Sequence, residues 1–174
     1  MALVCAATET RELWYALLTR ARHEKAVHRQ LLQKQIPAFL PTISCWSRWT
    51  DRNKQIERPL FPGYCFASFN PACPLPVMTC AGVLTIVSFG GVPAAIPSSE
   101  LDSIRLLVAS KTTDCEPHAS LCEGTLVEVV NGPLSGVVGR LLRKDLTHAS
   151  IVLSIDVIGH GVRVQVKAAD VVLR

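Results

Sequence analysis

Hydrophobic and polar positions follow two different periods at the start of the chain. The run Trp14–Leu18 is aromatic and aliphatic, which is typical of a strand. Across residues 23–35 the period lengthens to that of an amphipathic helix, and Pro37 ends it. The apolar side of this predicted helix is formed by Val27, Leu31, Leu32 and Ile36. The pattern therefore predicts a strand followed by a helix.

The next segment predicts further strands. Residues 38–49 have an extended pattern and are followed by a polar turn at 50–54, so we expect a hairpin. In the strand predicted at 60–69, a period of two places Tyr64 and Phe66 on one face. Phe69 falls on the other face with Cys65 and Ala67, so both faces carry aromatic side chains.

A strand at 83–89 and a second amphipathic helix complete the first domain. Ser99 and Asp102 have the spacing of a capping box, and the helix after them is expected to bury Leu101, Ile104, Leu107 and Val108. This order of strands and helices predicts a small α/β sandwich over residues 12–110.

The last third of the chain carries only strand signals. Residues 111–120 are polar and lack periodicity, so we predict a flexible linker there. Five short β-rich runs follow in residues 121–174, separated by turns rich in glycine. So many strands in so short a segment predict a small β-barrel. Together with the α/β sandwich of residues 12–110, the predicted fold class is α+β.

Composition excludes several classes of protein. Of the 174 residues 49% are hydrophobic, so the chain can bury a core. Residues 59–99 contain no charged side chain or histidine, but their regular prolines break helices, so we predict buried strands rather than a membrane span. The first ten residues lack the basic start of a signal peptide. The seven cysteines are odd in number and form no C-x-x-C pair, so we expect no disulfide framework or zinc site but reduced thiols in a cytoplasmic protein.

Charge is concentrated near the N-terminus. Residues 1–58 hold ten Lys/Arg and five Asp/Glu, whereas the whole chain has a net charge of +4. A basic segment of this kind predicts contact with a polyanion such as nucleic acid, and the alternative is a solvated helix face. No spaced pair of nucleophile and base and no phosphate-binding glycine loop is present, so we do not expect an enzyme or a cofactor.

Several motifs together resemble one family. Trp14-Tyr15, the stretch from Arg58 to Tyr64, and Gly90-Gly91 followed by Ala95-Ile96-Pro97 are similar to the N-terminal (NGN) domain of the NusG family. Residues 127–136, followed by Gly139, are similar to its KOW motif. The start at Arg20 and the Pro59–Tyr64 stretch look closer to the specialised RfaH and UpxY type antiterminators than to the housekeeping factor.

The resemblance implies a bacterial transcription elongation and antitermination factor. In this family the N-terminal domain binds the clamp helices of the largest RNA polymerase subunit, and the matching positions here are Phe61, Tyr64, Phe66 and Phe89. The domain also lies beside upstream or non-template DNA, for which the candidate residues are Arg20, Arg22, His23, Lys25 and Arg29. The pattern alone favours ordinary core positions for Phe61 and Phe89, and only the resemblance favours a binding role for Tyr64 and Phe66. The alternative for the cations is a solvated helix face.

The resemblance also implies a partner for the SH3-like KOW barrel, such as the ribosome or the Rho terminator. Ile158 and His160 occupy the contact loop. His160 stands where the housekeeping factor has an arginine, and a neutral imidazole does not replace a permanent cation. We expect a monomer without metal or membrane contact. The rival function is an RNA-binding or ribosome-associated KOW protein with no polymerase role.

Overall fold

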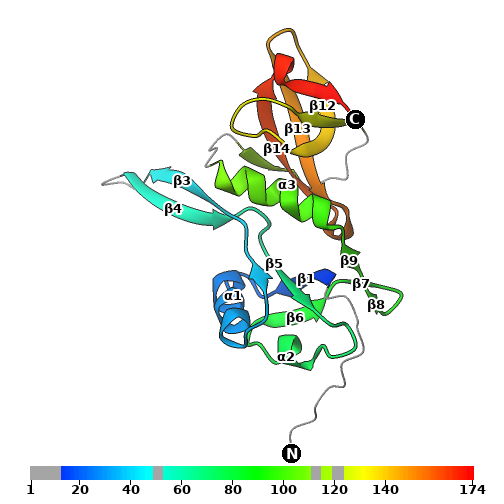
Figure 1. Cartoon of the computed structure of the whole chain (residues 1–174). Coiled ribbons are helices and arrows are strands. Elements are labelled where there is room, and N and C mark those ends of the chain that lie inside the picture. Colours follow the sequence, from blue (N-terminus) through cyan, green and yellow to red (C-terminus); the bar gives the residue numbers. More distant parts are fainter. Residues whose placement is uncertain (1–12, 49–52, 111–114, 119–123) are drawn as a thin grey trace, which may run out of the picture. The chain divides into compact units, whose positions relative to one another are not determined.

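The structure is a computed structural model that describes residues 13–48, 53–110, 115–118 and 124–174 (Figure 1). It divides into two compact units. The first comprises the chain up to Leu40 together with Gly63–Ile96, and the second comprises Pro41–Pro62 and Pro97–Arg174. The mixed content of strands and helices agrees with the predicted fold class at this level.

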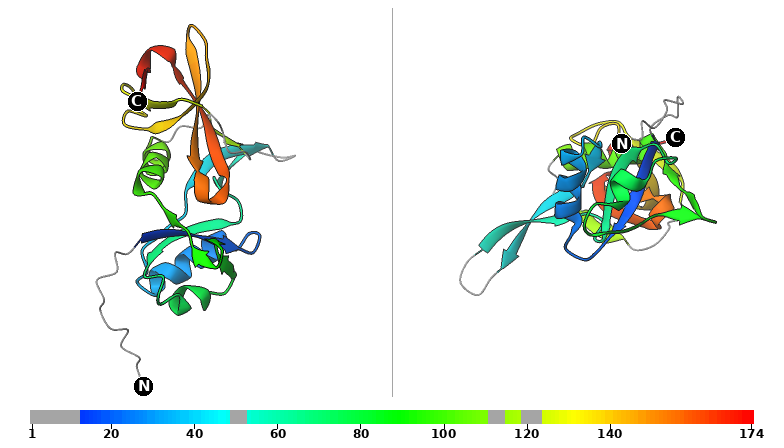
Figure 2. Two further views of the ribbon diagram at one scale, coloured as in Figure 1. Left: turned by 90° about the vertical axis from the view of Figure 1, so that its right-hand side faces the viewer. Right: turned by 90° about the horizontal axis from the view of Figure 1, so that it is seen from below.

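The first unit is built on an antiparallel sheet in the order β2-β5-β1-β6. The central strand β1 (Leu13–Thr19) pairs with β5 (Tyr64–Phe69), β6 (Val83–Ile86) and β9 (Ala95–Ile96), while β2 (Ala38–Phe39) pairs with β5. Helices α1 (Glu24–Gln33) and α2 (Leu75–Met78) lie against one face of this sheet (Figure 2). The strand and the helix predicted at the start of the chain are confirmed.

The core of the first unit lies between that face and the helices. Its members alternate along the strands, as a period of two requires, and are joined by apolar residues of α1 and α2 and by Cys80 just after α2. They are Tyr15, Leu17, Cys65, Ala67, Phe69, Ile86, Val27, Leu31, Val77 and Cys80. The rings of Tyr15 and Phe69 lie 4.9 Å apart between centroids. Of the two faces that the sequence distinguishes in this strand, the one with residues 65, 67 and 69 is therefore the face that packs on the helices.

In its described residues, the second unit contains a separate hairpin, one α-helix and a larger sheet. Strands β3 (Thr42–Arg48) and β4 (Asn53–Pro59) form the predicted antiparallel hairpin. Helix α3 (Ser98–Ala109) begins after Pro97, and no side chain caps its N-terminus. The predicted capping box is wrong, because Ser99 lies inside the helix instead of preceding it.

The C-terminal sheet has six strands in the order β10-β14-β13-β12-β11-β15. They are β10 (Cys115–His118), β11 (Leu126–Val129), β12 (Val138–Lys144), β13 (His148–Ile155), β14 (His160–Lys167) and β15 (Val171–Leu173), with short 3-10 turns η1 (Asp156–Ile158) and η2 (Ala168–Asp170). The five strands expected from the sequence are all present. Strand β10 is an addition: it lies inside the range predicted as a linker and pairs with β14 from Cys115 to His118.

Glycine permits one close approach in this sheet. A Cβ at Gly139 of β12 would lie 2.8 Å from both the side chain of Leu153 and the carbonyl oxygen of Val152. Only a residue without a side chain allows β12 and β13 to pass at this distance.

None of the helices in the described part of the chain is long and apolar enough to cross a membrane.

Candidate functional site

The turn before β5 is fixed by a buried carboxylate. Gly63 has a φ of +83°, a conformation that favours glycine. Its N–H donates to the Glu24 carboxylate at 2.8 Å, and its carbonyl accepts the N–H of Thr19 at 2.8 Å. Glu24 is only 6% exposed. The first turn of α1 therefore holds the residue that directly precedes Tyr64.

The predicted DNA-contacting residues surround this turn of α1. All five are exposed, and they lie in the loop after β1 and along α1: Arg20, Arg22, His23, Lys25 and Arg29. The loop is ordered by backbone contacts, since Arg20 N–H donates to Gly82 at 2.8 Å. Arg22 adopts a φ of +64°, which is uncommon outside glycine. The structure therefore gathers these five side chains on one accessible segment of the first unit.

The lysine at the C-terminal cap of α1 does not belong to this group. The Lys34 ammonium donates to the carbonyl of Pro76 at 2.7 Å and to the hydroxyl of Thr79 at 2.8 Å. These bonds tie the end of α1 to α2. Lys34 is therefore engaged in holding the first unit together.

The aromatic residues predicted to contact polymerase differ strongly in exposure. Phe66 is fully buried, and its ring lies 6.5 Å from that of Phe39. Phe61, in the second unit, is 2% exposed. Tyr64 is half-buried, whereas Phe89 is 65% exposed. Of these four predicted contact residues, only Phe89 and part of Tyr64 offer an aromatic surface to a partner in this conformation.

Phe89 lies in a short hairpin. Strand β7 (Ser88–Phe89) pairs with β8 (Val92–Pro93), and Phe89 is the register partner of Val92. Gly90 and Gly91 form the two-residue connection with φ of +58° and +82°, the conformation that a two-residue hairpin turn demands. Val92 is 68% exposed. The hairpin therefore presents an aromatic and an aliphatic side chain to solvent.

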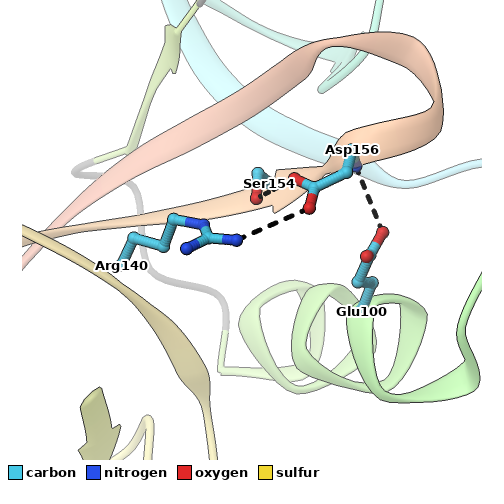
Figure 3. Close-up of polar contacts among 4 residues, drawn as sticks. All are labelled: Glu100, Arg140, Ser154 and Asp156. Carbon is cyan, nitrogen blue, oxygen red and sulfur yellow. Dashed lines mark hydrogen bonds and ion pairs between the residues drawn. The ribbon is translucent and has the colours of Figure 1, made fainter. Parts of the chain in front are cut away.

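In the second unit, helix α3 contacts the C-terminal sheet through polar side chains (Figure 3). A carboxylate oxygen of Glu100 accepts the N–H of Asp156 at 3.2 Å, and the Ser103 hydroxyl accepts the N–H of Val138 at 3.2 Å. Arg140 and Asp156 form an ion pair at 3.6 Å. We call Glu100, Ser103, Val138 and Asp156 the α3 junction. Burial, and then the charge of Asp156, raise the pKa of Glu100.

A cavity of about 450 Å³ adjoins the α3 junction within the second unit. Its lining is mixed, with Ser103 and Glu100 from α3, Arg140 and Leu153 from the sheet, and Arg174 beyond β15. Two cations therefore face it together with the carboxylates of the junction.

The loop predicted to contact a further partner lies between β13 and β14. Ile158 is 8% exposed, and His160 is half-buried with its Nδ1 2.7 Å from the Ile158 carbonyl oxygen. Gly159 between them has a φ of +65°. The structure brings the two predicted residues together, with the imidazole turned back onto its own loop.

Cysteine chemistry differs in part from expectation. Cys65 and Cys80 are buried free thiols, as predicted, and burial raises the pKa of Cys65 to about 12. Cys73 is disulfide-bonded, so the expectation of uniformly reduced thiols is wrong for this residue. Within the described ranges, no group of three or more His, Cys, Asp or Glu side chains is placed to hold a metal ion.

We compared the chain with curated proteins and with solved structures. No curated protein matches the chain significantly. Among solved structures, one that describes domain interaction in NusG from Thermotoga maritima matches this chain with a TM-score of 0.55 and 20% sequence identity. The match covers 92% of this chain and 96% of that one. Two conformations of the MjSpt4:Spt5 complex match at 15% identity with TM-scores of 0.33 and 0.32, over 92% and 93% of this chain and 96% and 98% of theirs.

The family comparison carries the assignment. The model described as transcription termination factor NusG matches residues 12–105, which span the first unit, the β3–β4 hairpin and most of α3. That range is more than half of the chain, and it contains the turn at Gly63, the exposed basic segment and the β7–β8 hairpin. The chain therefore belongs to the NusG family of transcription factors.

Proposed function

We propose that this protein is a bacterial transcription elongation and antitermination factor that acts by binding and not by catalysis. Its first unit would bind the clamp helices of RNA polymerase through an apolar aromatic surface. The exposed cations near α1 would contact upstream or non-template DNA. Holding the clamp closed would disfavour paused states, and a differential binding energy of about 1.4 kcal/mol changes a population ratio tenfold.

The observation that carries this proposal is the exposed Phe89–Val92 pair on the β7–β8 hairpin. Both side chains are more than half exposed. An aromatic ring in such a place loses little conformational freedom on binding and buries a large area. Tyr64 adds a partly accessible ring. Phe66 and Phe61 are buried and would take part only if the segments that cover them moved.

The C-terminal sheet would act as an SH3-like KOW barrel that recruits a second partner, such as the ribosome or Rho, through Ile158 and His160. We propose that the protein belongs to the specialised RfaH or UpxY subgroup of the family. We also propose that it is a monomer in the cytoplasm. A purely RNA-binding or ribosome-associated role would not require the accessible Phe89–Val92 pair.

Substitution of Phe89 tests the polymerase contact. We expect Phe89→Ala in the full chain to weaken binding to bacterial core polymerase by about ten- to a hundredfold, because aromatic anchors contribute about 1–3 kcal/mol or more. Its free energy of unfolding should change by less than about 0.5 kcal/mol, since the ring is exposed. Binding would be measured by fluorescence anisotropy and stability by urea titration.

Leu75→Ala is the matched control, because Leu75 is 73% exposed in the same unit. It should change neither quantity. Phe66→Ala is unsuitable as the decisive variant: removing a fully buried phenylalanine costs about 3–5 kcal/mol, so lost binding would report unfolding. Unchanged polymerase binding by a folded Phe89→Ala protein would rule out this contact.

A further inference from the structure

Helix α3 supplies hydrogen-bond acceptors to backbone donors at the ends of strands. Val138 begins β12, and Asp156 follows the end of β13. The N–H of Asp156 donates to the Glu100 carboxylate at 3.2 Å, and the N–H of Val138 donates to the Ser103 hydroxyl at 3.2 Å. Both acceptors lie on one face of α3. Residues three apart on a helix lie side by side. Leu106 continues the same contact, since a Cβ at Gly136 would lie 3.5 Å from its Cδ1.

The α3 junction brings two carboxylates together. Asp156 is stabilised by Arg140 at 3.6 Å and by the Ser154 hydroxyl, which donates to it at 2.8 Å (Figure 3). Glu100 shares this environment and is itself half-buried. Its bond to the Asp156 amide holds it next to the Asp156 carboxylate, so ionisation of both groups is opposed by their mutual repulsion.

The other charged side chains around the junction form ion pairs of their own. Arg174 lines the adjoining cavity and lies 4.0 Å from Glu128 of β11. On α3 itself, Asp102 and Arg105 form a separate ion pair at 2.7 Å with exposed side chains. Arg140 is therefore the cation placed at the two junction carboxylates, and it is already paired with Asp156.

We propose that the α3 junction is a proton-sensitive latch, in which protonation of Glu100 strengthens the contact between α3 and the C-terminal sheet and its ionisation weakens that contact. The neutral carboxyl group keeps an oxygen that can accept the Asp156 N–H, while the repulsion from the Asp156 carboxylate disappears. The inference rests on the geometry of the second unit and does not require polymerase binding.

The direction of the effect follows from linkage. Burial and the Asp156 charge raise the pKa of Glu100 above its usual 4.5, against the opposing effects of the Asp156 N–H and Arg140. The docked helix therefore holds a proton more tightly than the undocked helix. The additional docking free energy is fully present below pH 4.5 and is lost as the pH rises through the docked pKa. A difference of one between the docked and undocked pKa changes the docking equilibrium about tenfold.

Two backbone amides report this latch separately. In the ¹⁵N-labelled full chain, the Asp156 amide senses Glu100 directly, whereas the Val138 amide senses the position of α3 through Ser103. We expect both signals to shift with one midpoint above 4.5 when the pH is varied between about 4 and about 7.5. In Glu100→Gln both signals should stay near their low-pH positions throughout.

Two further variants complete the test. Asp156→Asn should lower the midpoint, since it removes the like charge and frees Arg140 for Glu100. Asp102→Asn, an exposed acid of the same helix, should leave both titrations unchanged. The latch is refuted if the Val138 amide does not follow the Asp156 amide, if the midpoint is at or below the ordinary glutamate value, or if Glu100→Gln titrates like the natural protein.

Discussion

The buried carboxylate of Glu24 allows a quantitative prediction about the first unit. Glu24→Ala removes the acceptor of the Gly63 N–H, a bond of 2.8 Å to a side chain that is 6% exposed. A hydrogen bond to a charged group contributes about 1.5–3 kcal/mol, and an amide left unpaired retains its desolvation cost. We therefore expect the free energy of unfolding of the first unit to fall by about 2–3 kcal/mol.

Glu24→Gln separates the hydrogen bond from the charge. The amide side chain keeps an oxygen acceptor, so its loss should be about 0.5–1.5 kcal/mol, that of a neutral bond. Urea titrations should be followed through the amide signals of β1 and β5, because the chain has two compact units and a global signal would mix them. The Gly63 amide should move upfield in Glu24→Ala as it loses its acceptor.

Arg29→Ala provides the control, since Arg29 is exposed on the same helix. It should change stability by less than about 0.5 kcal/mol. If Glu24→Ala is no more destabilising than Arg29→Ala, the Gly63 turn does not depend on this carboxylate, and the account of how α1 positions Tyr64 fails.

Two further predictions concern the first unit. Arg20→Ala should reduce the slope of log affinity for DNA against log salt by about 0.7–0.9, the value of one phosphate contact, and an unchanged slope would exclude that contact. Cys65 should resist alkylation at about pH 8 by about a thousandfold relative to the urea-unfolded chain, because burial raises its pKa from 9.0 to about 12; equal rates measured by mass spectrometry would contradict this. Since the native thiol has the higher pKa, its contribution to stability is present below pH 9.0 and is lost as the pH rises toward about 12.

Local periodicity predicted most elements because it reports which side of each segment is buried. Helix α1 and the β3–β4 hairpin follow from spacing and turn residues alone. Exposure of the individual aromatics did not follow. Tyr64 and Phe66 lie on the same face of β5, yet one is half-buried and the other fully buried. The difference depends on distant segments of the chain, which a period of two does not encode.

Polar residues that become buried are the harder case. The polarity of Glu24 and Ser103 suggests exposure to solvent, but they are 6% and 5% exposed. Each is buried because it accepts a backbone N–H from a distant segment, Gly63 or Val138. Burial of such a group is affordable only when its hydrogen bond is made.

The positions of those donors are set by where strands begin and turn, and no feature near the acceptor reveals them. The N–H of Gly63 comes free because the chain turns into β5, and that of Val138 because β12 starts there. A carboxylate or hydroxyl on a helix then becomes structural through a partner far along the chain. Glu24 in the first unit and Ser103 in the second are therefore structural contacts beside the apolar core, and the Glu24 substitutions separate this role from that of a surface charge.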